Sequence, residues 1–241
     1  MADSKRFTTA LLNKKQVSKD AYSFYFKKND FYYLPGQYIR LTLKIDTPDE
    51  RGSSRFFTLS SSPTEEHLMI TTRILQSAFK KTLTNLKRED EVSMFGPLGK
   101  FILKEDEHKK HVFLAGGIGI TPYRAMIKYA VDRHLKIQIT LFTSFKTVED
   151  YAFRDFFHNV ASESNWFKLV ETITQPEESN QLWTGHRGRI DADLIRKNID
   201  DLQNSLFFIS GPPKMVDGLK EIVKSLNVTD DTINIEKFSG Y

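Results

Sequence analysis

The sequence of 241 residues contains no cysteine. Disulfides, thiolate zinc sites and a cysteine-ligated iron–sulfur cluster are therefore excluded on this chain, and any iron–sulfur partner must be a separate molecule. The chain also lacks an apolar run of about 18 residues and a signal-peptide pattern at its start, so we expect a cytoplasmic protein with no membrane span. Basic residues form no block, and we expect no nucleic-acid partner and no metal site.

The remaining composition suits two modest domains. A chain of 241 residues is long for one common domain and about right for two of roughly 100 to 140 residues each. Hydrophobic residues make up 39% and aromatic residues 12% of the chain, which is enough apolar surface for two cores. Subtracting 31 acidic from 35 basic residues gives a net charge of +4. This mild excess can steer an acidic partner or a phosphorylated ligand, or can belong to an ordinary solvated surface.

The N-terminal part has the pattern of a small antiparallel β-barrel. Short alternating segments are separated by Pro, Gly, Asp and Asn, as expected of strands joined by turns. The predicted strands cover 7–12, 22–26, 38–43, 56–59 and 68–74. A helix is predicted over 77–86, with Ser77 as its N-cap and Phe79, Leu83 and Leu86 at helical spacing. A last strand over 91–95 leads into a predicted loop over 96–99.

After a charge-dense linker the rhythm of the sequence changes. Little in residues 104–110 can be buried, so we place the domain boundary there, between a barrel domain over 1–105 and a second domain over 106–241. Strands then alternate with helices, which predicts an α/β domain with a parallel sheet. The predicted strands cover 111–115, 137–142, 166–172, 206–210 and 232–238, and the predicted helices 122–133, 151–160 and 213–226.

The strongest single motif is a glycine-rich turn that follows an apolar strand, Gly116-Gly117-Ile118-Gly119-Ile120-Thr121-Pro122. Glycines let the backbone approach a pyrophosphate closely, while free amides and the helix dipole favour its negative charge. Thr121 is predicted to cap a helix whose first residue is Pro122, which has no amide hydrogen to leave unpaired. The same glycines also suit a tight turn with no ligand, and their spacing is not G-x-G-x-x-G.

A second motif, Ser210-Gly211-Pro212-Pro213-Lys214-Met215, follows the buried strand 206–210. Its prolines can open a helix because their φ is already fixed near the helical value. The same pattern is also expected where a core strand is followed by a helix and no ligand binds. In a doubly wound sheet, ligands lie at the carboxyl ends of the strands. The two motifs are therefore expected to flank one crevice, and together they are far more specific than either alone.

In the first half, Arg55-Phe56-Phe57-Thr58 places four different side chains on one predicted strand. Alternation puts Arg55 and Phe57 on one face and Phe56 and Thr58 on the other. A guanidinium suits a phosphate, a flat ring suits an isoalloxazine, and a hydroxyl suits a flavin ring nitrogen. Aromatic residues on a strand are also common in a hydrophobic core.

These motifs resemble the ferredoxin-NADP reductase superfamily. Its flavin motif is Arg-x-Tyr-Ser/Thr, and its nucleotide domain carries Gly-Gly-x-Gly-x-x-Pro and then Cys/Ala-Gly-Pro-Pro-x-Met. The matches follow the family's order from Pro35-Gly36-Gln37-Tyr38 to the C-terminus. The resemblance implies a two-domain fold, with an antiparallel β-barrel flavin domain followed by an α/β parallel-sheet nucleotide-binding domain.

Carried over by position, the resemblance implies a flavin site on the first domain. The Arg55–Thr58 motif, with Phe56 inside it, would pair Arg55 with the FAD pyrophosphate, stack Phe57 on the flavin and hydrogen-bond Thr58 to the nitrogen that accepts hydride. Phe57 replaces the usual Tyr, so the phenolic hydrogen bond to the ribityl chain is lost. Arg73 would contact the phosphate or adenine side, or is a solvent-exposed strand residue. The segment whose amides hold the pyrophosphate, which favours FAD over FMN, would be Ser77, Ala78, Phe79 and Lys80.

The resemblance also implies a nicotinamide site on the second domain. The residues that would line the nucleotide pyrophosphate are Gly116, Gly117, Gly119, Thr121 and Pro122. Those around the nicotinamide would be Ser210, Gly211, Pro212, Pro213 and Met215, with Ser210 where many members have Cys. Near the C-terminus, Phe238 would cover the flavin ring until nicotinamide displaces it, Tyr241 would reach the adenine, and Glu236 would relay protons. The bland alternative for this tail is a frayed terminus with one buried Phe.

The implied activity is hydride transfer from NAD(P)H to FAD, followed by single-electron release to an acidic carrier protein such as ferredoxin or flavodoxin. Reduction of small acceptors, such as free flavin or ferric complexes, and a role as an electron-transfer subunit of a larger complex stay open. Ser144 and Lys146 follow the second strand of the nucleotide domain, where a hydroxyl and an ammonium can receive a 2′-phosphate. NADPH is therefore preferred over NADH, although an ordinary polar loop has the same composition. The oligomeric state is not indicated.

Overall fold

The computed structural model describes residues 3–106 and 108–238. Contacts divide the chain into two compact units. The first contains Met1–Leu103 and Thr121–Arg133, and the second contains Lys104–Ile120 and His134–Tyr241. In the part that the structure describes, no helix is both long and apolar enough to cross a membrane.

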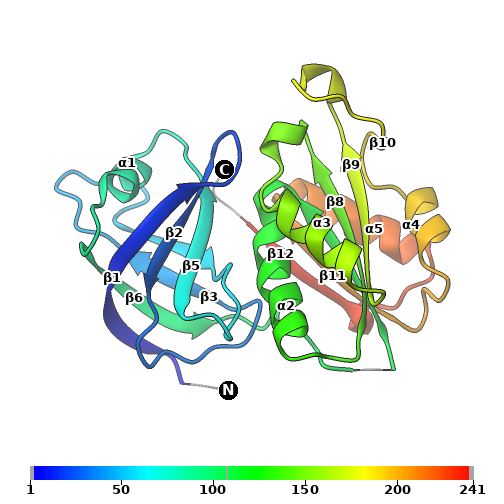
Figure 1. Ribbon diagram of the computed structural model, residues 1–241, viewed down its shortest axis with the longest axis horizontal. Helices are drawn as coiled ribbons and strands as arrows, with labels where there is room; N and C mark the ends of the chain where they lie inside the picture. The colour runs from blue at the N-terminus through cyan, green and yellow to red at the C-terminus, as the bar shows by residue number, and fades with distance from the viewer. Residues whose placement is uncertain (1–2, 107, 239–241) are drawn as a thin grey trace. The chain divides into compact units, whose positions relative to one another are not determined.

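The first unit is built on a nearly closed antiparallel barrel of six strands (Figure 1). Its strands, in the spatial order β4-β3-β6-β1-β2-β5, are β1 (Lys5–Gln16), β2 (Ala21–Lys27), β3 (Tyr38–Thr42), β4 (Ser54–Thr58), β5 (His67–Arg73) and β6 (Glu91–Leu98). An isolated bridge between Leu59 and Ile70 brings the end of β4 to β5. The predicted barrel is therefore confirmed.

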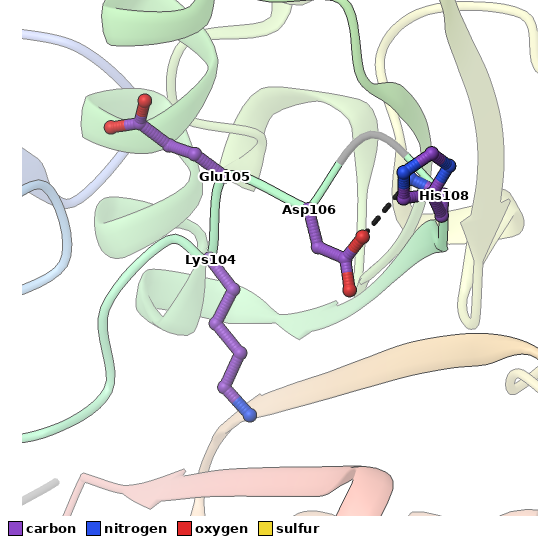
Figure 2. A pocket seen from close by; sticks show the side chains of 4 residues that line it. All are labelled: Lys104, Glu105, Asp106 and His108. Carbon is purple, nitrogen blue, oxygen red and sulfur yellow. Dashed lines mark hydrogen bonds between the residues drawn. The ribbon is translucent and has the colours of Figure 1, made fainter.

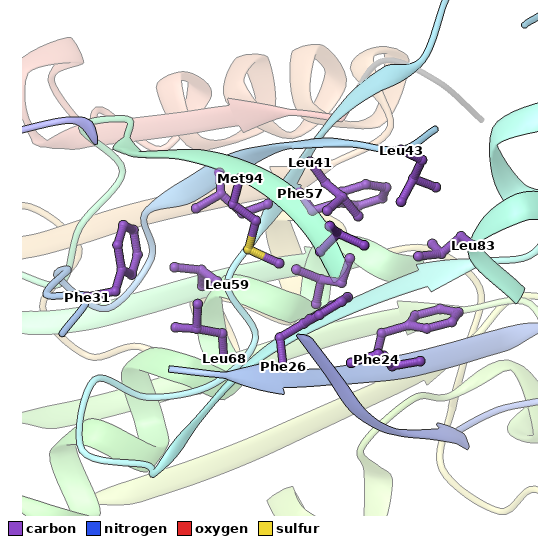
Figure 3. Packing of buried hydrophobic residues seen from close by; sticks show 14 of the residues in the cluster. Phe24, Phe26, Phe31, Leu41, Leu43, Phe57, Leu59, Leu68, Leu83 and Met94 are labelled. Atoms are coloured by element: carbon purple, nitrogen blue, oxygen red, sulfur yellow. The ribbon is translucent and has the colours of Figure 1, made fainter. Parts of the chain in front are cut away.

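The barrel core is made by the alternating inward side chains of these strands. Phe24 and Phe26 lie two residues apart on β2, so both point to the same side, and neither is exposed. Phe57 on β4 is paired in register with Ile39 on β3 and joins the same cluster. Figure 3 shows these rings packed with Met94 and several leucines.

One helix, α1 (Ala78–Asn85), follows β5 and buries Phe79 and Leu83 in the barrel core. The Ser77 side chain accepts a hydrogen bond from the Lys80 backbone N–H at 3.2 Å, so the predicted N-cap is confirmed.

The second unit contains a parallel sheet of six strands. The strands, in the spatial order β10-β9-β8-β7-β11-β12, are β7 (Lys110–Gly116), β8 (Gln138–Phe145), β9 (Phe167–Ile173), β10 (His186–Arg187), β11 (Ser205–Gly211) and β12 (Ile233–Lys237). Helix α3 (Arg154–Glu163) lies in front of this sheet in Figure 1, with α4 (Ala192–Asn198) and α5 (Pro213–Ser225) behind it. The predicted α/β domain with a parallel sheet is confirmed.

Several local features differ from the sequence prediction, among them strand β10, which was not predicted, and β1, which extends beyond the predicted 7–12. The predicted loop 96–99 is wrong in part, because β6 continues to Leu98, and Pro97 falls where the β3–β6 register shifts and a missing N–H is tolerated. Helix α3 begins at Arg154 instead of 151, because Phe153 has a left-handed φ of 63°. Helix α4 was not predicted, although Asp191 caps it by accepting from Leu194 N–H at 2.8 Å.

Helix α2 (Thr121–Asp132) follows the glycine-rich turn in the sequence but packs with the barrel in the first unit. Arg124 forms a two-pronged ion pair with Glu65, with Nη2 at 2.9 Å from Oε1. Both side chains are only 13% exposed. The Arg124 guanidinium also donates to the Ser60 carbonyl at 3.1 Å, so this arginine joins α2 to the barrel at two points.

Removing this arginine should loosen α2 from the barrel. Arg124→Met leaves the Glu65 carboxylate buried without its partner, which typically costs about 3–5 kcal/mol of unfolding free energy. Urea denaturation should show that loss, and hydrogen exchange of the α2 amides should accelerate. The control is Lys128→Met on the same helix, whose ion pair with Asp132 is more exposed and worth about 0.5 kcal/mol. Equal losses in the two variants would contradict the assignment.

Candidate functional site

The structure brings the two predicted flavin segments of the first unit together. The Phe57 and Phe79 ring centroids are 5.8 Å apart, and the Arg55 guanidinium lies 5.1 Å from the Phe79 ring. The Lys80 ammonium lies 4.9 Å from the centroid of Phe57. Residues from β4 and from the start of α1 therefore form one cluster of two aromatic rings and two cations.

Arg55 is held by the loop that precedes its strand. Its Nη1 donates to the backbone carbonyls of Arg51, Gly52 and Ser54 at 2.6–2.8 Å. Its Nη2 donates to Oδ1 of Asp49 at 2.7 Å. The side chain is 9% exposed. The guanidinium thus has a fixed position and already holds one negatively charged oxygen, so the residues present fit an anionic group such as a pyrophosphate.

Lys80 is strongly affected by its surroundings. Burial, followed by the charges of Arg51 and Arg55, lowers the pKa of Lys80 from 10.5 to about 7. Its ammonium donates to the Thr72 hydroxyl. Three cationic side chains therefore gather at this site, and the lysine gives up part of its charge near neutral pH.

The remaining flavin candidates have varied surroundings. Phe56 is 63% exposed and touches Tyr38 edge-on, with centroids 5.7 Å apart. Thr58 ends β4 and is buried. The guanidinium of Arg73 pairs with Asp20, with Nε at 2.7 Å from Oδ2. Arg73 is therefore committed to an ion pair at the turn between β1 and β2, and its predicted phosphate contact stays a prediction.

In the second unit, the two predicted turns meet at the carboxyl ends of neighbouring strands. β7 and β11 pair in parallel, with Ser210 opposite Ala115. The Ser210 hydroxyl donates to the Gly119 carbonyl at 2.5 Å and is fully buried. The strand order runs outward in both directions from this pair, so the turns lie at the switch point where open α/β sheets bind ligands.

Close contact with backbone atoms requires glycine at position 119, whereas at Gly116 the nearest atoms belong to a flexible side chain. A Cβ at Gly119 would lie 2.4 Å from the Ser210 carbonyl oxygen and 2.6 Å from Gly211 Cα. A Cβ at Gly116 would lie 1.9 Å from the Met215 sulfur, because this side chain packs directly over the turn. Gly117 is different, since a Cβ there meets nothing within 4 Å but φ is +53°. Gly117 is also the one half-buried residue of an otherwise buried turn, so its backbone is the part of the turn that no side chain of its own covers.

The helix starts around these turns match the sequence prediction only in part. A 3₁₀ turn, η1 (Gly117–Ile120), leads directly into α2. Thr121 is the first residue of α2 and Pro122 is the second, so the prediction that Thr121 caps the helix is wrong. Helix α5 begins at Pro213 with Pro212 as its N-cap residue, as the Pro-Pro pair predicts.

The end of β8 carries the predicted 2′-phosphate residues. Ser144 pairs with Gly116 across the sheet, and Lys146 follows it with an exposed side chain. The nearby acidic residues are engaged in backbone contacts. Asp150 accepts from Thr147 N–H at 3.2 Å, and Glu149 accepts from Asn180 N–H at 3.0 Å.

The C-terminal candidates lie along β12. Glu236 is opposite Ser210 in the β11–β12 pair. The Phe238 backbone N–H donates to the Gly211 carbonyl at 2.9 Å, and its side chain is half-buried. Tyr241 lies outside the described residues.

An open hollow lies at the start of the second unit, lined by Lys104, Glu105, Asp106 and His108 (Figure 2). The His108 backbone N–H donates to Asp106 Oδ1 at 3.0 Å. None of the predicted cofactor residues lines it, so we do not assign the site there. The residues that sequence reasoning missed are Asp49 and Thr72, which only their contacts with Arg55 and Lys80 identify.

Comparisons with known proteins find matches over both parts of the sequence. Residues 113–221 match the family model of the oxidoreductase NAD-binding domain. The chain is 27% identical over 198 residues to the glycine betaine monooxygenase reductase subunit of Chromohalobacter salexigens, covering 81% of this chain and 53% of that protein. It is 27% identical over 237 residues to the flavohemoprotein of Bacillus subtilis, covering 95% of this chain and 58% of that protein.

A solved structure shows the same fold over both units. The ferredoxin NADP+ reductase from Neisseria gonorrhoeae, with bound FAD and NADP, matches with a TM-score of 0.81 and 17% identity, covering 97% of this chain and 98% of that one. The chain therefore has the two-unit fold of this solved structure, and within it residues 113–221 match the oxidoreductase NAD-binding domain. It spans little more than half the length of the two curated relatives named above.

Substitutions at the glycine turn should separate close contact from backbone strain. In Gly119→Ala the new Cβ meets backbone atoms that cannot rotate away, so we expect a loss of about 3 kcal/mol of unfolding free energy. Gly117→Ala changes only the cost of a positive φ, about 1 kcal/mol. Urea denaturation of both variants measures the difference. A larger loss in Gly117→Ala would show that the close approach of the two turns is not the constraint.

Replacing Lys80 should stabilise the flavin-free protein at low pH. The pKa of Lys80 is about 7 when folded and 10.5 ordinarily, so the unfolded chain binds the extra proton between these values. The penalty of the charged form is complete below the folded pKa and is relieved as pH rises above it. We expect Lys80→Met to raise the unfolding free energy by about 2–4 kcal/mol near pH 6 and by less near pH 9.5.

Urea denaturation at the two pH values measures this effect. The control is Lys81→Met, because Lys81 is exposed and adjacent in the sequence. A Lys80→Met gain that does not shrink as pH rises would rule out the titration of Lys80 as its cause.

Proposed function

We propose that this protein is a reductase that binds FAD on its first unit and NAD(P)H on its second. The observation that carries the proposal is a pair of phosphate-compatible sites on separate units. The first places the fixed guanidinium of Arg55 and the start of α1 beside Phe57. The second is the glycine turn at the switch point of a parallel sheet.

In the first unit, Arg55 and the amides of the Ser77–Lys80 segment would hold the pyrophosphate of FAD, and Phe57 would contact the flavin ring. When bound, FAD supplies the chemistry of accepting a hydride and releasing electrons singly. Thr58 would donate or accept a hydrogen bond at the flavin edge, since it ends β4 one residue beyond Phe57. Binding and orientation, not acid–base chemistry, are the main contributions of these residues.

In the second unit, the turns around Gly116 and Gly211 would hold the nicotinamide nucleotide. Ser210 is buried, and its hydroxyl donates a hydrogen bond to the Gly119 carbonyl, so it would hold the two turns together rather than serve as an acid or base. Glu236 and Phe238 lie beside Ser210 and Gly211, which supports a role for both near the nicotinamide.

NADPH is the proposed coenzyme. Lys146 is exposed after β8 and offers an ammonium to a 2′-phosphate, with Ser144 before it. Glu149 and Asp150, the acidic residues nearest in sequence, are engaged with backbone N–H groups, which leaves them poorly placed for the ribose hydroxyls of NADH.

The proposed electron acceptor is a separate, acidic carrier protein such as ferredoxin or flavodoxin. The relatives named above include a monooxygenase reductase subunit, which favours a protein acceptor over a small molecule. Reduction of free flavin or ferric complexes is the second candidate and would appear as turnover without any protein partner. The cytoplasmic location stays a prediction from the sequence.

The class and coenzyme choice can be tested by absorption spectroscopy. The purified protein, loaded with FAD, should show flavin bands near roughly 380 and 450 nm that bleach under anaerobic conditions, faster with NADPH than with NADH. A protein that binds neither FAD nor either nucleotide would contradict the proposal. Faster bleaching with NADH would overturn only the coenzyme preference.

Thr58 can be tested by removing its hydroxyl. Thr58→Val keeps the shape of the side chain and should slow flavin reduction by NADPH by about tenfold or more, in line with a hydrogen bond that matters in the transition state. Stopped-flow kinetics at the flavin band measures the rate. Thr58→Ser should restore most of it. A loss well below tenfold in Thr58→Val would argue against this role.

A further inference from the structure

The carboxylate of Asp49 occupies the anion-binding part of the first unit. Arg55 Nη2 donates to Asp49 Oδ1 at 2.7 Å, and the Arg51 backbone N–H donates to the same oxygen at 3.0 Å. Burial alone would raise the pKa of Asp49, but hydrogen bonds from Arg55 and from the backbone N–H groups of Arg51 and Ala78 outweigh it and lower the pKa. Ala78 is the first residue of α1.

This carboxylate is supplied by a different segment from the helix that it faces. The first turn of α1 contains no acidic residue, and its cap, Ser77, serves the Lys80 N–H. Asp49 lies in the loop between β3 and β4, where most side chains are exposed. The loop therefore delivers one negative charge to Arg55 and the start of α1, the same groups that would hold the pyrophosphate of FAD.

We infer that Asp49 is an internal competitor of the flavin pyrophosphate, which sets how tightly the first unit binds FAD without affecting its affinity for a flavin that carries no phosphate. This inference rests on the proposed function. Asp49 occupies one of the Arg55 N–H donors, and two negative groups at one guanidinium repel each other. Binding of FAD is therefore opposed by the Asp49 carboxylate and is favoured by its displacement from Arg55.

The contacts of Arg55 allow that displacement without moving the guanidinium. Its other nitrogen, Nη1, is held independently by the carbonyls of Arg51, Gly52 and Ser54. The Asp49 side chain is 29% exposed, so it has solvent to rotate into. A rotation of one side chain is enough to free the Nη2 donor, and the loop backbone keeps Arg55 in place.

The test compares Asp49→Asn with Glu50→Gln. Both remove one negative charge from the same loop, but Glu50 is exposed and is the next residue along the chain. FAD and riboflavin are titrated into each flavin-free protein, and Kd is obtained from flavin fluorescence. We expect Asp49→Asn to bind FAD at least about fivefold more tightly than the wild type, because the repulsion is gone. Glu50→Gln should match the wild type, and riboflavin should bind all three alike.

The outcomes are distinguishable. If Asp49→Asn binds FAD equally or more weakly, Asp49 only positions Arg55 and the inference is overturned. If riboflavin affinity rises as much as FAD affinity, the effect does not come from the pyrophosphate and the inference also fails. Asp49→Ser, which carries no acceptor of the same length, must agree with Asp49→Asn; thermal unfolding shows that each variant is folded.

Failure of the proposed function gives a different result. If the wild type binds no flavin, the reductase proposal is wrong, but inorganic pyrophosphate still tests Asp49. The amide resonance of Ala78, followed by NMR, should then respond to pyrophosphate at lower concentration in Asp49→Asn than in the wild type or Glu50→Gln. An unchanged midpoint would overturn the inference on its own.

Discussion

The second unit depends on two turns that approach each other with no side chain between them. Gly119 faces the backbone of Ser210 and Gly211 so closely that even one methyl group cannot be inserted. The hydroxyl of Ser210 then uses this closeness by donating to the Gly119 carbonyl. This contact joins the ends of the parallel strands β7 and β11 at the switch point of the sheet, directly before α2 begins.

The electrostatics of the first unit are unbalanced in a way that fits an anionic ligand. Arg55 and Lys80 lie over the rings of Phe79 and Phe57, Arg51 adds a third positive charge near Lys80, and Asp49 is the carboxylate paired with Arg55. Burial and the neighbouring positive charges disfavour the charged form of Lys80, so its pKa is lowered. A bound pyrophosphate would compensate the cations and raise the pKa of Lys80 again, because a negative charge favours the charged form of the lysine.

Much of this arrangement could be predicted from the sequence, because it depends on local patterns. Alternation located the strands, Ser77 identified the start of α1, and the glycines identified the turn at the end of β7. What could not be predicted depends on contacts between distant segments. The pairing of Asp49 with Arg55 and the burial of Lys80 against Thr72 have no short-range signature. Helix α4 is the exception, since its cap, Asp191, is a local signal of the kind that predicts a helix start.

The attachment of α2 to the barrel has a consequence for how such a protein can be divided or recombined. The chain passes between the two units after Leu103, Ile120 and Arg133. A cut at the linker would separate Glu65 from Arg124 and leave a buried carboxylate without its counterion. In evolution, a barrel exchanged between reductases would therefore have to bring this helix with it, or bring a partner helix that supplies the same charge. The heritable module is a structural unit assembled from two stretches of sequence, not one contiguous segment.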